Sequence, residues 1–141
     1  MTIDFHEWRE RKGESADPET ERLATIALGA AFEVHTALGP GHPEKVYEEA
    51  LCHELTLRQI PFTRQARVFL RYKGKEVGES CVHILVGDRV VLELKSIERF
   101  TDVHVSQALA YLAALKLRLA LLINFNVAHL KQGIKRAIRD L

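Results

Sequence analysis

Apolar residues recur every three or four positions over the first part of the chain, a spacing typical of amphipathic helices. In the first such segment the repeating positions are Leu23, Ile26, Ala27, Ala30, Val34 and Leu38. Asp17-Pro18 provides a capping side chain followed by proline at the first helical position, and Gly39-Pro40-Gly41 ends the helix. A second helix is predicted from about Pro43 to Gln59, before Pro61.

The middle of the chain changes to partial alternation of apolar and polar residues, with many β-forming side chains. Three strands are predicted over Phe62–Tyr72, Glu76–Val86 and Arg89–Lys95. Turn residues at 73–75 and 87–88 separate them, so we expect an antiparallel meander.

The helical spacing returns at Val103, with Thr101 or Asp102 as the cap. Leu117–Phe125 is apolar enough to be a strand buried on both faces. Asn126 is expected to cap a last helix that runs through Ile138. The predicted order is α-α-β-β-β-α-β-α. This order indicates an α/β (α+β) fold, in which helices pack on a mixed four-stranded sheet.

Composition bounds the domain organisation and the function classes. With 141 residues, of which 47% are hydrophobic and 28% charged, the chain can form one core. We expect a polar N-terminal arm over residues 1–17 and a single domain over 18–141. The 20 basic and 19 acidic residues give a net charge of +1, which excludes a polycationic nucleic-acid coat but allows a local basic groove.

Two further observations concern the cellular compartment. The longest apolar run, Ala108–Leu115, is far shorter than the ~20 residues of a membrane span, so no membrane association is expected. Cys52 and Cys81 form neither a metal-type spacing nor a CxxC pair. No signal peptide precedes them, and we expect reduced thiols in a cytoplasmic protein.

Two charges interrupt the third predicted strand. Glu93 and Lys95 are two residues apart and therefore point to one face, either as a solvated cross-strand ion pair or as part of a site. A three-residue turn at 87–89 would place His83 opposite Glu93 on that face, whereas a two-residue turn would place Val82 there. In the first register, His83, Glu93 and Lys95 could hold a divalent metal and an attacking water.

Other polar residues could reach the same face, and each has a simpler interpretation. Glu44 lies in the first turn of the second helix, where a carboxylate is also favoured by the helix dipole. Gln107 and Tyr111 share a helix face, which could equally be an amphipathic boundary. A basic stripe follows the first strand and its turn, and it could bind phosphates or protect an edge strand. Its residues are Arg64, Arg67, Arg71, Lys73 and Lys75.

Several of these residues form spaced motifs that occur together in one known family. Gly41-His42-Pro43-Glu44-Lys45-Val46-Tyr47 fits a GxxExxY signature. It is followed by the Tyr72-Lys73-Gly74 turn, the VxLELK strand ending at Lys95, Gln107xxxTyr111 and the LLINFN segment over 121–126. From about Leu23 to the C-terminus, the chain resembles the bacterial GxxExxY proteins, a branch of the PD-(D/E)XK nuclease superfamily.

This resemblance implies a restriction-endonuclease-like core and a cofactor, Mg²⁺ or Mn²⁺. The ion would be held by the residue at position 83, by Glu93, by the backbone carbonyl of Leu94 and by Glu44, and Lys95 would be the catalytic lysine. The resemblance also implies a nucleic-acid partner, with Gln107 and Tyr111 lining its path. A homodimer is expected, because so small a nuclease domain covers little nucleic acid alone.

The chain departs from the family pattern at position 83, where His83 stands in place of the usual strand aspartate. Imidazole suits Zn²⁺, Mn²⁺ or iron better than Mg²⁺. Three hypotheses follow. The protein is a metal-dependent nuclease with an altered ligand set, a degenerate nuclease fold that binds nucleic acid or a protein without cutting, or an interaction module in which His83 is a packed core residue.

Overall fold

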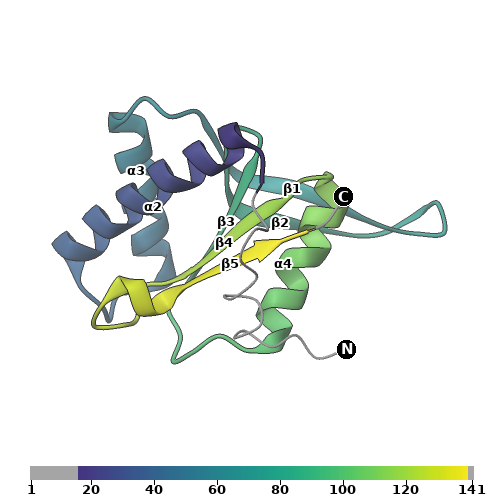
Figure 1. Ribbon diagram of the computed structural model, residues 1–141. Helices are drawn as coiled ribbons and strands as arrows, with labels where there is room; N and C mark the ends of the chain where they lie inside the picture. The colour runs from purple at the N-terminus through teal and green to yellow at the C-terminus, as the bar shows by residue number, and fades with distance from the viewer. Residues whose placement is uncertain (1–15, 140–141) are drawn as a thin grey trace.

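The computed structural model describes residues 16–139, and Figure 1 shows a single mixed sheet with helices on both faces. In chain order the elements are α2 (Pro18–Leu38), α3 (Glu44–Leu57), β1 (Phe62–Tyr72), β2 (Lys75–Val86), β3 (Val90–Lys95), α4 (Asp102–Leu115), β4 (Leu119–Asn124), the 3₁₀ helix η1 (Leu130–Gly133) and β5 (Ile134–Ile138). The strand order is β1-β2-β3-β4-β5. Only the β3–β4 pair is parallel, and the α4 crossover joins these two strands.

The sheet separates two apolar clusters. The larger packs α2 and α3 against the even-numbered residues of β3 and the odd-numbered residues of β4, and Ala27, Leu51 and Leu92 are fully buried in it. The smaller packs α4 against the opposite face through residues such as Ala108 and Leu112. β3 and β4 are therefore buried on both faces, as the apolar run over 117–125 predicts.

The predicted helix start at Asp17 is confirmed. The Asp17 carboxylate accepts hydrogen bonds from the Thr20 hydroxyl at 2.7 Å and from the Thr20 backbone N–H at 3.2 Å. Gly39 ends α2 with φ of 68°, and its N–H donates to the carbonyl of His35. Thr101 caps α4, one of the two residues expected there. The arm predicted over residues 1–17 lies outside the described residues, except for Ala16 and Asp17 at its end.

The prediction of a last helix from Asn126 through Ile138 is wrong. This segment forms η1 and the fifth strand, β5, which pairs antiparallel with β4. Without β5, the buried strand β4 would leave one edge of backbone N–H and C=O groups unpaired. Basic residues spaced four apart over 131–139 suggested the outer face of a helix. In the structure, Ile134 and Ile138 pack on the α2 side and Ala137 packs on the α4 side, an alternation typical of a strand.

Within the described range, no helix has the length and apolar character needed to cross a bilayer.

Candidate nuclease site

The β2–β3 register places His83 beside Glu93. Val86 pairs with Val90 across a three-residue turn, and the regular pairing continues to Ile84 and Leu92. Beyond that pair, hydrogen bonds from backbone N–H groups to side chains replace the hydrogen bonds between the two backbones. The His83 backbone N–H donates to Oε1 of Glu93 at 3.2 Å, and the Leu94 backbone N–H donates to Nδ1 of His83 at 2.9 Å. The register that brings these residues together is the first of the two that the sequence allows.

The regular alternation of side chains along β2 is interrupted at His83. Val82 packs in the α4 cluster, yet Ile84, two residues later, packs in the cluster on the other face. Residues two apart share a face in a regular strand, so the backbone is irregular between them. On β1, the facing residue Gln65 has φ of 53°. This local break directs Gln65 and His83 toward the first turns of α3, where Gln65 Nε2 donates to Oε1 of Glu48 at 2.6 Å.

Both ring nitrogens of His83 are engaged. Because a backbone N–H faces Nδ1, that nitrogen must present a lone pair, and the ring proton of the neutral form is on Nε2. Nε2 lies 2.9 Å from Oε1 of Glu44, to which it donates. On the other side, Nδ1 lies 3.5 Å from Oε2 of Glu93. The imidazole therefore stands between the two carboxylates and links α3 to β3.

Glu93 is buried behind this ring, with 6% of its surface exposed. Burial raises the pKa of the Glu93 carboxyl, and the neighbouring His83 and Lys95 oppose that effect. A cavity of about 400 Å³ opens in front of the site, lined by Glu44, His83 and, around them, Lys45, Glu48 and Gln65. Glu44 and His83 are therefore reachable from solvent, whereas Glu93 lies beneath them.

Lys95 is half-buried at the carboxyl end of β3. The pKa of His104, in the first turn of α4, is lowered by burial first and then by the positive charge of Lys95. Lys95 therefore contributes its charge to the space between β3 and the α4 N-terminus.

The GxxExxY residues hold the loop that precedes Glu44. The Tyr47 ring is fully buried and stacks on Phe125 with centroids 4.5 Å apart. Its hydroxyl donates to the Gly39 carbonyl at 2.6 Å and accepts from the His42 N–H at 3.2 Å. Gly41 has φ of 97°, which favours glycine. The motif residues Gly41 and Tyr47 thus shape the loop and orient the start of α3.

Two residues that sequence reasoning did not assign to the site fix the segment after Lys95. The Ser96 hydroxyl donates to the His42 carbonyl at 2.8 Å, tying the end of β3 to the Glu44 loop. Buried Asn124 accepts from the Ile97 N–H at 3.1 Å and donates to the Ile97 carbonyl at 2.8 Å. The signals for Asn124 were its place at the end of an apolar strand and within the LLINFN segment of the resemblance.

The residues expected to line the nucleic-acid path have other contacts. Tyr111 is 6% exposed, and its hydroxyl lies 2.9 Å from the Ser80 hydroxyl, while Gln107 is exposed on α4. Arg64 bridges Glu48 and Glu49 on α3 at 2.7 and 2.8 Å. Arg67 pairs with Glu79 on β2 at 2.9 Å. Of these four, Arg64 lies nearest the site, since Glu48 also lines its cavity.

Among residues 16–139, no group of three or more His, Cys, Asp or Glu side chains is arranged to hold a metal ion.

A family model described as the PD-(D/E)XK nuclease superfamily matches residues 21–137. The five-stranded mixed sheet is consistent with the restriction-endonuclease-like core expected for such a match. No curated protein and no solved structure matches the chain.

Proposed function

The chain belongs to the PD-(D/E)XK nuclease superfamily, and on that premise we propose that it is a metal-dependent nuclease of the GxxExxY branch that hydrolyses phosphodiester bonds of DNA or RNA. One observation carries this proposal. Glu44 and Glu93 approach opposite sides of the His83 ring, with Lys95 two residues beyond Glu93. Glu44 comes from α3, and Glu93 and Lys95 come from β3. This grouping of two carboxylates and an ammonium near the end of β3 supports the proposal.

The two carboxylates fit a hard divalent cation such as Mg²⁺ or Mn²⁺. Glu44, Glu93 and the Leu94 carbonyl would hold it once the His83 ring has moved from between the two carboxylates. His83 would join them only after its ring moves, because metal binding through Nε2 puts the ring proton on Nδ1, which now accepts from the Leu94 N–H. A bound divalent ion lowers the pKa of its water and offsets phosphate charge.

The protein's own groups would orient and neutralise the substrate. Lys95 would stabilise negative charge that develops on the phosphate and help to orient the attacking water. Exposed Gln107 is free to contact a strand that passes α4, and Tyr111 would set the surface beneath it. Arg64 would bind phosphate by exchanging its present carboxylate partners, whereas Arg67 would stay paired with Glu79 beside the strand.

A second candidate function is nucleic-acid or protein binding without cleavage. The observation that favours it is the engagement of both His83 nitrogens, which leaves Glu93 covered. In that case the neutral His83 ring occupies the space between Glu44 and Glu93 that a metal ion would otherwise take.

Cleavage of labelled single- and double-stranded DNA and RNA distinguishes the two functions. Each substrate is incubated with Mg²⁺, with Mn²⁺ or with EDTA, using the native chain, Glu93→Gln and the exposed-site control Glu98→Gln. The nuclease proposal expects metal-dependent cutting that Glu93→Gln abolishes and Glu98→Gln retains. No cutting in any condition, together with salt-sensitive binding, would favour the binder. Cutting that appears only in His83→Asp would trace the loss of activity to position 83.

The proposal includes a homodimer, on the argument that one small domain covers little nucleic acid. Light scattering should then give twice the 16.0 kDa mass of the chain. A monomer at all accessible concentrations would contradict it.

A further inference from the structure

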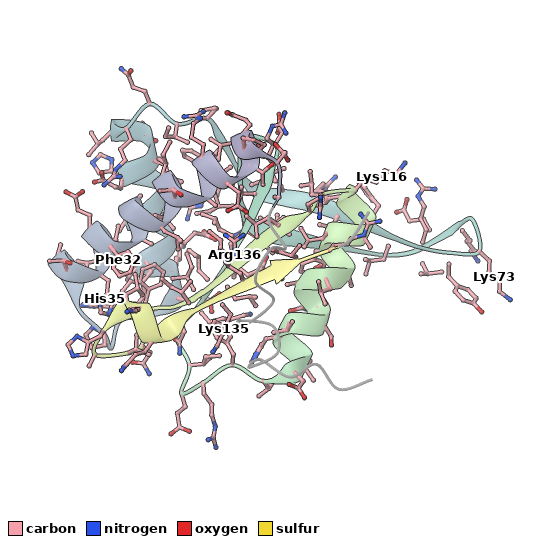
Figure 2. The ribbon with its side chains drawn as sticks, viewed as in Figure 1. Phe32, His35, Lys73, Lys116, Lys135 and Arg136 are labelled. Carbon is pink, nitrogen blue, oxygen red and sulfur yellow. The ribbon has the colours of Figure 1, made fainter. Side chains whose placement is uncertain are left out.

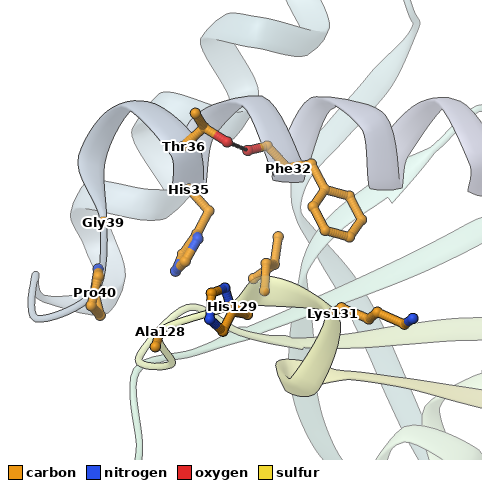
Figure 3. Close-up of a pocket in the computed structure, with 9 residues that line it drawn as sticks. Phe32, His35, Thr36, Gly39, Pro40, Ala128, His129 and Lys131 are labelled. Carbon is orange, nitrogen blue, oxygen red and sulfur yellow. Dashed lines mark hydrogen bonds between the residues drawn. The ribbon is translucent and has the colours of Figure 1, made fainter.

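A second and larger cavity, of about 640 Å³, lies between the C-terminal half of α2 and the segment that leads from β4 into η1 (Figure 3). In Figure 3, Phe32 and His35 extend from α2 toward the segment that bears His129 and Lys131. Leu130 and Pro40 complete its apolar surface. Its volume falls in the range of ordinary small-ligand sites. Nothing in the chemistry of the Glu44–Glu93 site uses these side chains.

The lining selects a planar ligand that carries negative charge. Phe32 is 41% exposed and offers a flat apolar face to the cavity. Lys131 is an exposed cation, and His129 adds a ring N–H donor. Among the described residues that line the cavity, none is an aspartate or glutamate. An aromatic face beside cationic and neutral donors is the combination that binds a nucleobase with its phosphate.

The cavity adjoins the candidate nuclease site. Gly39 and Pro40, which line it, belong to the loop that leads directly to Glu44. On the other wall, the Val127 carbonyl accepts from Nε2 of His35 at 2.8 Å, which fixes this segment to α2. The same segment is tied to the end of β3, because Asn124 bonds both Ile97 and the Asn126 N–H. A strand bound at Glu44 would therefore cross only one loop to enter the cavity.

We propose that this cavity binds one nucleotide of a single-stranded DNA or RNA, with the base against Phe32 and the phosphate at Lys131 and His129. The inference rests on the proposed function for its substrate class and makes that class more specific. A paired base must first unpair and unstack to enter a pocket, which costs free energy, whereas an unpaired base turns out of the strand at lower cost. The cavity therefore makes the protein prefer single strands.

The test measures binding of fluorescent 12-nucleotide single strands and matched duplexes by anisotropy, in EDTA so that no metal-dependent cutting occurs. The variants are Phe32→Ala, Phe32→Trp and Lys131→Ala. Matched controls are Phe69→Ala, whose ring on β1 is 42% exposed, and Lys116→Asn at the end of α4. Figure 2 shows Lys116 and Phe32 on opposite sides of the molecule. Thermal melting verifies that each variant is folded.

Phe32→Ala should weaken single-strand binding by roughly 5- to 100-fold, the range expected for the loss of one base stack. Phe32→Trp should retain binding, and both controls should stay within about 2-fold of the native chain. Lys131→Ala should reduce the dependence of log K on log salt by about 0.7. Duplex binding should not respond to Phe32→Ala.

Three results would overturn the assignment. The first is native affinity for single strands in both Phe32→Ala and Lys131→Ala, which would leave the nuclease proposal standing if cutting is observed. The second is an equal loss of duplex and single-strand binding in Phe32→Ala. The third is competition by a free mononucleotide as effective as that of the strand, which would assign the cavity to a small nucleotide. A loss confined to single strands supports the cavity even if the native chain does not cut.

Discussion

The side chain at position 83 decides how the two acidic residues of the site are held. An aspartate there would repel Glu44 and Glu93 in the absence of a cation. His83 instead accepts from the Leu94 N–H and lies between the two carboxylates. The ring thus completes a hydrogen-bonded arrangement without a metal, and it covers Glu93 while doing so. Two roles of His83, as a metal ligand or as a bridge between the carboxylates, can be distinguished by experiment. They can be distinguished because Nδ1 contacts the Leu94 N–H and Nε2 contacts Glu44.

Asparagine and alanine at position 83 should have different effects on stability. The asparagine Oδ1 can occupy the position of Nδ1 and accept from the Leu94 N–H, whereas alanine leaves that N–H without an acceptor. We expect His83→Ala to lower the free energy of unfolding by about 1–3 kcal/mol and His83→Asn to recover most of the loss. Urea unfolding at neutral pH measures both. Equal losses in the two variants would contradict the bridge.

Calorimetric titration of Mn²⁺ into His83→Asn and the native chain gives the matching readout for the metal. If the ring is a bridge, removing the Nε2 contact frees Glu44, and Mn²⁺ should bind at least as tightly as before. If His83 is a ligand, its loss should weaken binding by about 10-fold or more. Glu98→Gln, exposed beyond β3, is the control for a change of charge.

The placement of His83 beside Glu93 was one of two registers that the sequence allowed, because turn length sets the register. Glu44 was expected at the same place only from the resemblance. Roles that depend on distant partners could not be anticipated from the sequence. The Tyr111 hydroxyl lies within hydrogen-bond distance of Ser80, 31 residues away in the sequence. The Arg64 guanidinium donates to Glu48 on α3, 16 residues earlier. No spacing rule relates such pairs, since they meet only when helices dock on the sheet.

At the scale of elements, the type and bounds of a helix or strand could be predicted from sequence where local signals agreed with packing. The bounds of β1 follow directly from its alternation, and α2 begins at the predicted cap. The prediction of a helix over 126–138 was wrong because the local pattern there is ambiguous. The conformation of this segment is set by its pairing with the edge of β4. Gly133 marks the point where the chain turns into β5, since a Cβ there would overlap the carbonyl oxygen of Asn124.

Two glycine substitutions should therefore have opposite effects on stability. Gly133→Ala places a methyl group against the backbone at the end of β4, and we expect it to cost about 1–3 kcal/mol. Gly29→Ala lies within α2, where the nearest atom to the new methyl is Nη1 of Arg58 at 3.2 Å. The end of this long side chain needs only a small shift that keeps its pairs with Glu33 and Glu54, so the substitution should add about 0.5–1 kcal/mol through helix propensity. Denaturant unfolding of both variants provides the comparison. A neutral Gly133→Ala would show that β5 can separate from β4 at little cost.

At the scale of the whole molecule, the proposed site and the proposed nucleotide cavity lie in one region, apart from the β1–β2 hairpin. The Glu44–Glu93 site and the Phe32 cavity share the loop before α3 and the carboxyl ends of β3 and β4. The β1–β2 hairpin extends away from the helices to a distant tip that carries Lys73 (Figures 1 and 2). The basic stripe expected along β1 is divided in the same way, because Arg64 and Arg67 are paired with carboxylates while Lys73 lies 5.4 Å from the Tyr72 ring centroid at the tip.

This division predicts that the hairpin tip supplies long-range electrostatic attraction and Arg67 does not. Replacing Lys73 and Lys75 by glutamine removes two exposed cations, and the dependence of log K on log salt for single strands should fall by about 1.4. Arg67→Gln, whose charge is already offset by Glu79, should leave the slope nearly unchanged. Affinities measured from 50 to 200 mM salt provide both slopes. If Arg67→Gln lowers the slope as much as the double lysine variant, the Arg67–Glu79 pair opens on binding and the whole β1 edge contacts the strand. If neither does, the tip charges serve to protect an edge strand from pairing with another chain.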